Sequence, residues 1–331
     1  MRSKFPEVSI IIPNWNGKHL LKKCLSSIGK QTYRDFEILV IDNGSVDGSQ
    51  NFIKKNFAQV NLIELKNNIG FASAVNLGIK ICTGNYMVLI NNDTKVDKNC
   101  IKYLVSAAKK NKSAGMIAAK ILQLDKPKLI DSAGDYIDAV GHANNLGYGE
   151  EDGMEFEKGK YVFLVSGGGC LIKRKVFESI GFFDPDYFAY MEDVDFSFRA
   201  QLYGYKAFFE PKAVIYHKHK ATSSKYPAFT EYLQYRNMTM TIIKDFPIAL
   251  FLRDLNWLKI ILVNINTIRY LAGIGYLKEA LKAELFVLFN LFNLLKKRKQ
   301  IQSDIKVPVE YILENIRPKK LTFFGFLGKG I

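Results

Sequence analysis

The sequence predicts an α/β protein with a mostly parallel central sheet flanked by helices. Over the first 120 residues, short apolar runs alternate with segments whose apolar residues recur every three or four positions. The apolar runs also end in polar, turn-forming residues, as strands of a parallel sheet do. This alternation and spacing favour right-handed strand–helix–strand crossovers. A third observation is a change of character near residue 240, after which long apolar segments predict helices outside the sheet.

The N-terminal elements follow in a regular order. Residues 8–12 form an apolar run that ends at Pro13, which is typical of a strand buried on both faces. Leu21, Cys24, Leu25 and Ile28 then lie on one helical face. Further strands are expected at residues 37–42, 60–64 and 86–90, and the segments between them carry helical apolar patterns.

The middle of the chain is less regular. Six glycines between residues 134 and 159 predict a long surface excursion over residues 121–160, and loops of that length are uncommon unless they are functional. Strands are expected again at residues 161–165, 170–173 and 213–216. A short helix is expected to end at Ile180, and another begins at the acidic residues 192–195.

Composition excludes several classes of protein. With 48% hydrophobic residues, the 331-residue chain is not globally disordered. The four cysteines lie far apart, which argues against a disulfide scaffold or zinc ribbon and favours reduced, buried thiols, as in a cytosolic protein. The short polar N-terminus leaves no room for a signal peptide. The net charge of +15 indicates a polyanionic partner, either nucleic acid, an anionic membrane surface or phosphorylated substrates.

The C-terminal region, residues 241–331, carries 15 basic and 7 acidic residues and so just over half of the excess charge. Its apolar segments, residues 260–277 and 283–295, are interrupted by Asn, Arg and Glu and lack about 18 uninterrupted apolar residues, so a membrane-spanning helix is not supported. Two readings remain open with equal weight. These helices either lie in the headgroup layer of a membrane or pack on the catalytic core.

Polar residues follow the first, second and fourth predicted strands, at Asn14–Asn16, Asp42–Ser45 and Asn91–Asp93. In such sheets ligands bind at the carboxyl ends of the strands. A carboxylate at position 42 can accept hydrogen bonds from a nucleobase or ribose, and Trp15 could stack on a base. Asp42-Asn43-Gly44 is equally an ordinary turn sequence.

Carboxylates and histidines supply the candidate chemistry. Asp93 could hold a divalent cation that bridges two phosphates. Glu192 and Asp193 form a second acidic cluster, and a partly desolvated carboxylate there suits a general base. His217 and His219 share one face of an extended segment, and one of them could join Asp93 on a metal. Each feature also has an ordinary structural explanation as a turn, a helix N-terminus or a surface residue.

In combination, these motifs resemble family 2 glycosyltransferases with the GT-A fold. The resemblance rests on the order of the following blocks, which cover about residues 8–240: Val8-Ser9-Ile10-Ile11-Ile12-Pro13, Asp42-Asn43-Gly44-Ser45, Asn68-Ile69-Gly70-Phe71-Ala72 with Asn76, Asn91-Asn92-Asp93-Thr94, Gly181-Phe182-Phe183-Asp184, Glu192-Asp193-Val194-Asp195 with Arg199, and His217. Pro-Asn-Trp-Asn at the front and Tyr-x-Glu-Asp-Val-Asp later look most like the branch of rhamnosyltransferases, which points to a deoxythymidine-diphosphate sugar.

The resemblance implies a role for each matching residue. The expected nucleotide-sugar-binding residues are Pro13, Asn14, Trp15, Asp42, Asn68, Gly70, Asn76, Asn91, Asn92, Gly168 and Arg236. Asp93 and His217 are the expected ligands of a Mg or Mn ion, with His217 preferred over His219. Asn91 stands where the family motif has Asp, which removes one ligand charge. Asp193 is the expected general base, with Glu192 beside it.

The resemblance also implies the reaction and its setting. It predicts an inverting, metal-assisted transfer of a sugar from a nucleotide-diphosphate donor to a glycan or lipid-linked acceptor. The expected domains are a GT-A domain over residues 1–240, with nucleotide-binding and acceptor halves meeting near residue 120, and a basic helical region over residues 241–331. We expect a cytoplasmic protein that lies peripherally on the inner face of the cell membrane and does not bind nucleic acid, because the basic runs border apolar helices.

Two other readings compete with this one. A nicotinamide-dependent oxidoreductase needs a Gly-x-Gly-x-x-Gly turn after the first strand, where this chain has only Gly17. A catalytically inactive relative that binds sugar nucleotides or membranes as a scaffold is kept open by Asn91. The retention of Asp93, Asp193 and His217 argues against it.

Overall fold

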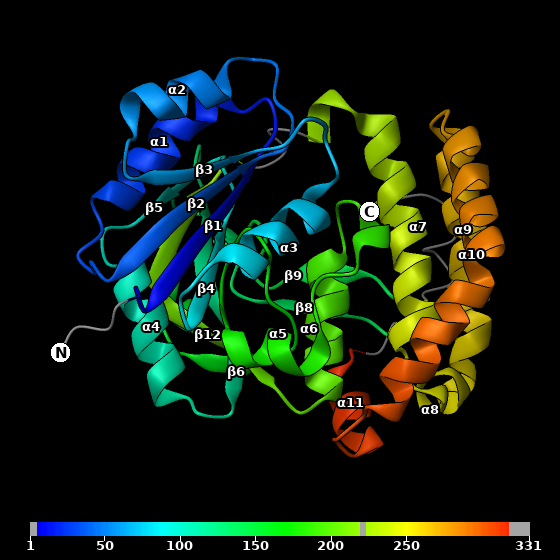
Figure 1. Cartoon of the computed structure of the whole chain (residues 1–331). Helices are drawn as coiled ribbons and strands as arrows, with labels where there is room; N and C mark the ends of the chain where they lie inside the picture. Colours follow the sequence, from blue (N-terminus) through cyan, green and yellow to red (C-terminus); the bar gives the residue numbers. More distant parts are fainter. Residues whose placement is uncertain (1–4, 219–222, 318–331) are drawn as a thin grey trace.

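A ten-stranded mixed sheet forms the centre of the computed structural model, which describes residues 5–218 and 223–317 (Figure 1). Its main strands run in the order β10-β12-β6-β11-β4-β1-β2-β3. The first strands are parallel neighbours, as the alternating pattern predicts, and their bounds are β1 Val8–Asn14, β2 Phe36–Asp42, β3 Val60–Glu64 and β4 Tyr86–Ile90.

The second half of the sheet departs from the expected parallel arrangement. Strand β11 (Gly169–Lys173) lies antiparallel between β4 and β6 (Ala114–Gln123), and β6 then pairs in parallel with β12 (Lys206–His217). The remaining strands of this sheet are β5 Thr94–Val96, β7 Ile130–Ser132 and β10 Lys160–Val162, and all three pair antiparallel. The sheet as a whole is therefore mixed, and only its N-terminal half is parallel throughout.

Helices cover both faces of the sheet. One apolar core lies between the sheet and α1 (Lys18–Gly29), α2 (Ser49–Asn56) and α4 (Cys100–Lys110). The other lies under α3 (Phe71–Ile81), α5 (Arg174–Ile180) and α6 (Glu192–Leu202). All four cysteines are free and buried, as expected from their spacing.

The surface excursion predicted for residues 121–160 is confirmed only in part, because most of residues 143–160 are exposed but an earlier part of the segment is not. Strands β7, β8 (Asp135–Ile137) and β9 (Ala143–Asn145) lie in this segment, and residues 130–135 are buried throughout. The strands are only three residues long, too short to show a period, so their burial depends on contacts from distant parts of the chain.

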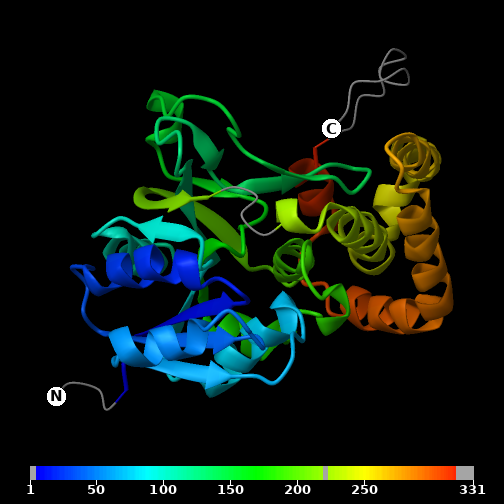
Figure 2. The same ribbon diagram turned by 90° about the horizontal axis from the view of Figure 1, so that it is seen from above.

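Five helices follow the sheet: α7 Pro227–Asp245, α8 Ile248–Leu252, α9 Asn256–Gly273, α10 Leu277–Ser303 and α11 Val309–Asn315. Helix α7 passes without a break through residue 240, the predicted domain boundary. Helices α9 and α10 stand on the outer side of α7, away from the sheet (Figure 2). Within the described residues, no helix is both long enough and apolar enough to cross a membrane.

Helix α10 has two different faces. Its inner face packs Val287 and Leu294 against Met240 of α7, which agrees with core packing. Its outer face exposes Leu285, Phe289 and Phe292 to solvent. The inner face thus agrees with the core-packing reading, and the membrane reading of the outer face stays a prediction.

Candidate active site

Side chains at the carboxyl ends of β1, β2 and β4 contact one another. The buried Asn14 amide donates to Asp42 Oδ2 at 2.8 Å, and Asn92 Nδ2 donates to Asn14 Oδ1 at 2.7 Å. The other oxygen of Asp42 accepts hydrogen bonds from the Ser45 amide at 2.9 Å and from Gln50 at 2.8 Å. The fold thus joins three of the predicted site residues, and both oxygens of Asp42 already have partners inside the protein.

The aromatic residue after β1 lies at the rim of this cluster. Trp15 follows Pro13 and Asn14, and its ring centroid is 5.5 Å from that of Tyr226, which immediately precedes α7. Both side chains are partly or largely exposed. Two aromatic rings that are far apart in the sequence therefore border the strand ends together.

The segment before α3 is held by its own polar groups. Asn68 Oδ1 accepts hydrogen bonds from the Gly70 amide and from Asn43 Nδ2, at 2.9 and 2.8 Å. Gly70 has φ +88°, and a Cβ there would lie 2.7 Å from the carbonyl oxygen of Phe188. Asn76 exchanges hydrogen bonds with the backbone of Phe183 on both sides of its amide. Both polar atoms of the Asn76 side chain are therefore used in joining α3 to residues 181–184.

Asp193 lies in the first turn of α6 and faces the glycines before β11. Its Oδ2 accepts a hydrogen bond from the Gly167 amide at 2.7 Å, and its Oδ1 accepts one from the Val194 amide at 2.9 Å. A Cβ at Gly168 would lie 2.7 Å from Asn91 Nδ2. The glycine segment therefore connects the end of β4 to the acidic pair.

Burial controls the protonation of this acidic pair. Desolvation raises the pKa of Asp193 above its ordinary value, although the amide hydrogen bonds favour the charged carboxylate. Glu192 is buried, and one of its carboxyl oxygens has no hydrogen-bond partner among the described residues. Burial, and next the charge of Asp193, raise the pKa of Glu192. Two adjacent acids with raised pKa values suit proton transfer.

His217, at the end of β12, lies between two carboxylates. Its Nδ1 is 2.6 Å from Asp131 Oδ2, and its Nε2 is 3.4 Å from Asp93 Oδ1. Burial by itself would lower the pKa of His217, but the hydrogen bonds and charges of Asp131 and Asp93 outweigh it and raise the pKa to about 10. His219 lies outside the described residues.

The residues around Asp93 fit a divalent cation that also contacts a substrate. Asn91 Oδ1 is buried and accepts no hydrogen bond from the described residues, and the buried Asp93 Oδ1 faces His217 Nε2 at 3.4 Å. Across the same residues, no group of three or more His, Cys, Asp or Glu side chains could hold a metal by itself. Mg²⁺ commonly takes only one or two carboxylates and completes its shell with water and substrate phosphates. The pairing of His217 with Asp131 is also the usual support of a metal-binding histidine.

Arg236 does not face the strand ends. It is buried in α7, and its guanidinium donates to the carbonyl oxygens of Asp186 and Tyr187, both at 2.8 Å. The ring of Phe286 lies 4.5 Å from the guanidinium carbon. These contacts lend the predicted phosphate contact no support, because the cation is committed to backbone carbonyls and an aromatic ring.

Two acids that sequence patterns did not single out lie near the site. Asp131 is the partner of His217. Asp135 is buried, and burial together with the charges of Asp193 and Asp131 raises its pKa to about 8. No local sequence pattern marks these two acids, because the strands that carry them, β7 and β8, are only three residues long.

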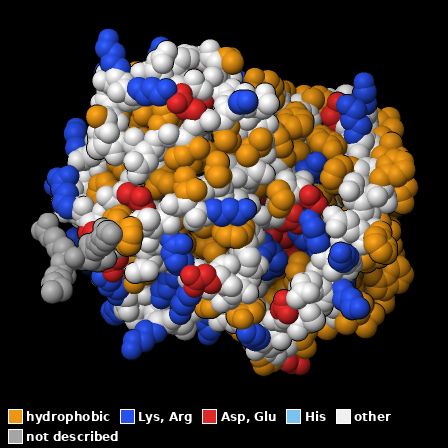
Figure 3. All heavy atoms as spheres, in the orientation of Figure 1, with side chains coloured by type: hydrophobic (Ala, Val, Ile, Leu, Met, Phe, Trp, Pro, Cys, Tyr) orange, Lys and Arg blue, Asp and Glu red, His pale blue; other side chains and the backbone are white. Residues whose placement is uncertain are grey.

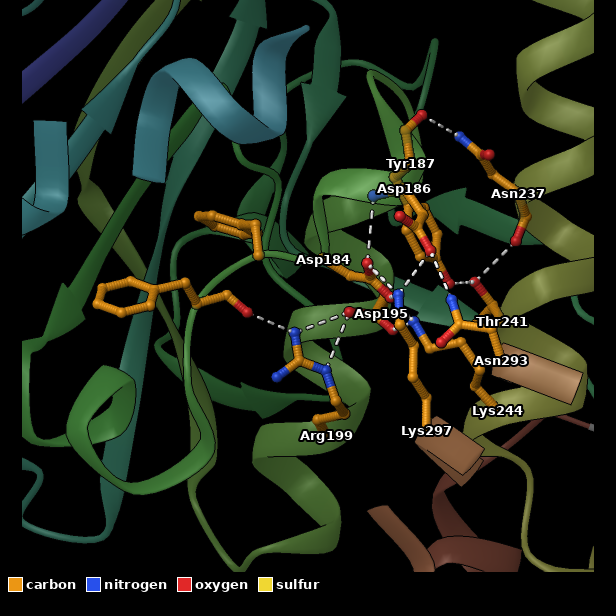
Figure 4. A network of polar contacts seen from close by, with 12 residues as sticks. Asp184, Asp186, Tyr187, Asp195, Arg199, Asn237, Thr241, Lys244, Asn293 and Lys297 are labelled. Atoms are coloured by element: carbon orange, nitrogen blue, oxygen red, sulfur yellow. Dashed lines mark hydrogen bonds and ion pairs between the residues drawn. The ribbon is translucent and has the colours of Figure 1, made fainter. Parts of the chain in front are cut away.

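A buried ion cluster, also unforeseen, joins the site to the C-terminal helices (Figure 4). Lys244 of α7 contacts Asp184 and Asp195, both at 2.6 Å, and Arg199 contacts Asp195 at 2.7 Å. Lys297 of α10 contacts Asp184 at 2.7 Å and Asp186 at 2.6 Å. One lysine of the basic run 296–299 therefore points into the protein.

Comparison with known proteins gives a family match. The family model described as glycosyl transferase family 2 matches residues 9–181, just over half of the chain. Poly-beta-1,6-N-acetyl-D-glucosamine synthase of Staphylococcus epidermidis is 25% identical over 212 residues, which are 63% of this chain and 49% of that protein. N-acetylglucosaminyl-diphospho-decaprenol L-rhamnosyltransferase of Mycobacterium tuberculosis is 28% identical over 231 residues, and the match covers 63% of this chain and 74% of that protein. The chain spans about half the length of the first of these relatives.

Solved structures agree on the fold. A mannosyltransferase from Pyrobaculum calidifontis, solved with GDP-Man and Mn²⁺, has a TM-score of 0.54 at 16% identity and covers 95% of this chain and 88% of its own. GalNAc-T7 with UDP, GalNAc and Mn²⁺ has a TM-score of 0.57 at 17% identity, and the match covers 72% of this chain and 48% of that one. The architecture is the expected GT-A fold, here with a mixed sheet and added C-terminal helices.

Proposed function

The chain belongs to glycosyltransferase family 2, and on this premise we propose that it transfers a sugar from a nucleoside-diphosphate donor to an acceptor hydroxyl group, with inversion. The observation that supports this most strongly is the position of Asp193 at the start of α6, hydrogen-bonded to the glycine segment beside the strand ends. Its raised pKa suits a group that accepts a proton.

In the proposed step, Asp193 accepts the proton of the acceptor hydroxyl while the hydroxyl oxygen attacks the anomeric carbon. One carbon–oxygen bond forms as the bond to the diphosphate breaks, and the nucleoside diphosphate leaves. The donor would lie at the ends of β1, β2 and β4, beside Asn14, Trp15 and Asn92. The raised pKa of Glu192 favours its own protonated form, which avoids a second negative charge beside the base.

A divalent cation, Mg or Mn, would be held by Asp93 and His217, with Asn91 supplying an uncharged oxygen. Asp131 would keep the His217 ring in place through its contact with Nδ1. Such a cation neutralises charge on a departing diphosphate. The neighbours solved with Mn²⁺ support this assignment, as does the buried Asn91 Oδ1, which has no hydrogen-bond partner among the described residues.

The proposed donor is a deoxythymidine-diphosphate sugar such as rhamnose, and the proposed acceptor is a lipid-linked or cell-surface saccharide. The resemblance of the Pro-Asn-Trp-Asn motif to the rhamnosyltransferase branch and the Mycobacterium tuberculosis relative support this choice. Release of nucleoside diphosphate from a panel of UDP-, GDP- and dTDP-sugars, each with Mg²⁺, Mn²⁺ or EDTA and a polyprenyl-diphosphate saccharide, tests it.

We expect turnover with the dTDP-sugar, dependent on the acceptor and abolished by EDTA. Turnover with UDP- or GDP-sugars alone would correct the donor and leave the transferase in place. Binding of nucleotides without turnover of any sugar would contradict the enzyme and favour the scaffold alternative, which the missing charge at Asn91 keeps open.

We also propose that the outer face of α9 and α10 binds an anionic lipid surface, which would bring the active site to a lipid-linked acceptor on the cytoplasmic side. This face is apolar along the right-hand edge of the molecule (Figure 3). It includes Trp257, Ile261, Leu285, Phe289 and Phe292. The exposed charged residues of α10 are all basic, namely Lys278, Lys282, Lys296 and Lys299, and they complement anionic headgroups.

Cosedimentation with phosphatidylglycerol vesicles at low salt checks this surface. We expect the double variant Phe289→Ser and Phe292→Ser to bind at least about tenfold more weakly, because a buried aromatic side chain contributes about 1.5–3 kcal/mol. These side chains are 80% and 85% exposed, so the folded protein tolerates their replacement. Met154→Ser, at a position 82% exposed on another surface, is the matched control and should bind as the wild type does. Failure of the wild type to bind, or a dimer that covers this face, would contradict the proposal.

A further inference from the structure

The segment that leads into the catalytic pair, residues 187–191, is held in an unfavourable backbone conformation. Phe188, Tyr190 and Met191 have φ values of 62°, 66° and 67°, a backbone region that residues other than glycine rarely adopt. Around Phe188 the chain forms a tight turn in which the Ala189 amide donates to the Tyr187 carbonyl at 2.7 Å. Such conformations cost about 1–3 kcal/mol each and persist only when the surrounding structure holds them.

Helix α7 supplies most of the contacts that hold this segment. Asn237 is fully buried, and its amide nitrogen lies 2.9 Å from the carbonyl oxygen of Tyr187 (Figure 4). The same nitrogen lies 2.9 Å from the carbonyl oxygen of Ala189 and 2.7 Å from that of Tyr190. Its own oxygen accepts a hydrogen bond from Arg236 Nε at 2.8 Å. One amide nitrogen therefore lies within hydrogen-bond distance of three carbonyl oxygens, at and just after the end of the short 3-10 helix Pro185–Tyr187.

The opposite side of the segment contacts the predicted nucleotide-binding half. The Ala72 amide donates to the Phe188 carbonyl at 3.1 Å, and Gly70 leaves just enough room for the Phe188 backbone. Residues 187–191 thus lie between α3 and α7, and the next two residues are Glu192 and Asp193. A shift of the segment would move the carboxylate of Asp193 relative to the strand ends.

We propose that Asn237 is a positioning residue for the reaction. It stabilises the left-handed backbone of residues 187–191 and so sets the position from which α6 presents Asp193 to the acceptor hydroxyl. This inference depends on the proposed function of Asp193. It assigns Asn237 no contact with either substrate, because its side chain is buried and all its polar atoms have partners in the protein.

The test replaces Asn237 with aspartate, which has the same shape and keeps the oxygen that Arg236 contacts but lacks the amide hydrogens. We expect kcat with the most active sugar nucleotide to fall about tenfold, since displacements of about 1 Å lower rates by up to about 10²-fold. Binding of UDP and dTDP, measured by calorimetry, should change by less than about twofold. Asn237→Ser, which is smaller and keeps one donor, is measured alongside in case the aspartate variant does not fold.

A double-mutant cycle with Asp193→Asn separates positioning from general damage. If Asn237 acts through the base, Asn237→Asp should cost less than about twofold once Asp193 is already asparagine. Asn111→Asp is the control, because it removes a similar amide bond, to the Ala107 carbonyl at 3.0 Å, at the end of α4 and away from residues 187–191.

The outcomes are distinct. An unchanged kcat in folded Asn237 variants, multiplicative effects in the cycle, or equal losses of nucleotide binding and kcat would each overturn the positioning role. Full activity of the Asp193→Asn single variant would instead overturn the proposed function on which the inference depends.

Discussion

Asp193→Asn is expected to lower the rate of sugar transfer by at least about 10²-fold, because general-base catalysis contributes about 10²–10⁴-fold and the amide cannot accept the proton. Nucleotide binding should survive, since the strand-end residues Asn14 and Asn92 contact each other without Asp193. Steady-state kinetics and calorimetric binding of the nucleoside diphosphate measure the two effects separately. Asp304→Asn, at an exposed carboxylate of the C-terminal region, should behave as the wild type does.

The pH dependence of the wild type gives the same assignment an independent check. A base must be deprotonated to act, so kcat/KM should rise with pH through the pKa of Asp193. Burial places that pKa above the ordinary value of about 3.9, and the acidic limb should therefore lie at higher pH than for an exposed aspartate. Near-normal turnover of Asp193→Asn, with the acidic limb unchanged, would contradict the assignment.

Lys244→Met is expected to lower the free energy of unfolding by about 3–5 kcal/mol, because it removes the cation shared by two buried carboxylates and leaves their negative charge only partly compensated by Arg199 and Lys297. Lys244 is buried between Asp184 and Asp195, and their charges raise its pKa although burial by itself would lower it. Two carboxylates in the core would lose their shared cation. Urea denaturation monitored by circular dichroism measures the loss.

A surface pair provides the matched control for this variant. Lys54 and Glu64 lie 2.8 Å apart with side chains 56% and 38% exposed, and solvent screens their attraction. Lys54→Met should therefore cost no more than about 1 kcal/mol. Similar losses for the two variants, or a loss below about 1 kcal/mol for Lys244→Met, would show that the cluster does not stabilise the junction between α6 and the C-terminal helices.

These two expectations meet at the first turn of α6, because Lys244 of α7 contacts Asp195 of that turn. Asp193 faces the glycine segment before β11, whereas Asp195, two positions later, faces Lys244 and Arg199. The first turn of α6 thus joins the proposed base to α7, and α7 also contacts residues 187–191 through Asn237. The C-terminal helices therefore form part of the outer surface of the protein and also hold the proposed site in place, through the contacts of Lys244 and Asn237.

The sequence alone predicted the first four strands and the polar residues at their ends. Local apolar periods determine these features, because a strand buried on both faces must be apolar throughout and can turn only at its ends. Asn14, Asp42 and Asn92 therefore occupy one edge of the sheet as expected. Motif order alone was also sufficient to indicate the family.

Tertiary structure decided what depends on contacts between distant residues. The antiparallel insertion of β11, the burial of residues 130–135, the pairing of His217 with Asp131 and the inward turn of Lys297 leave no local pattern. Each arises because a buried polar or charged group must find a partner wherever the fold brings one, and that partner lies 86 residues away for His217 and 113 for Lys297. Local periodicity reports which face of an element is buried, and only the folded chain determines which groups meet there.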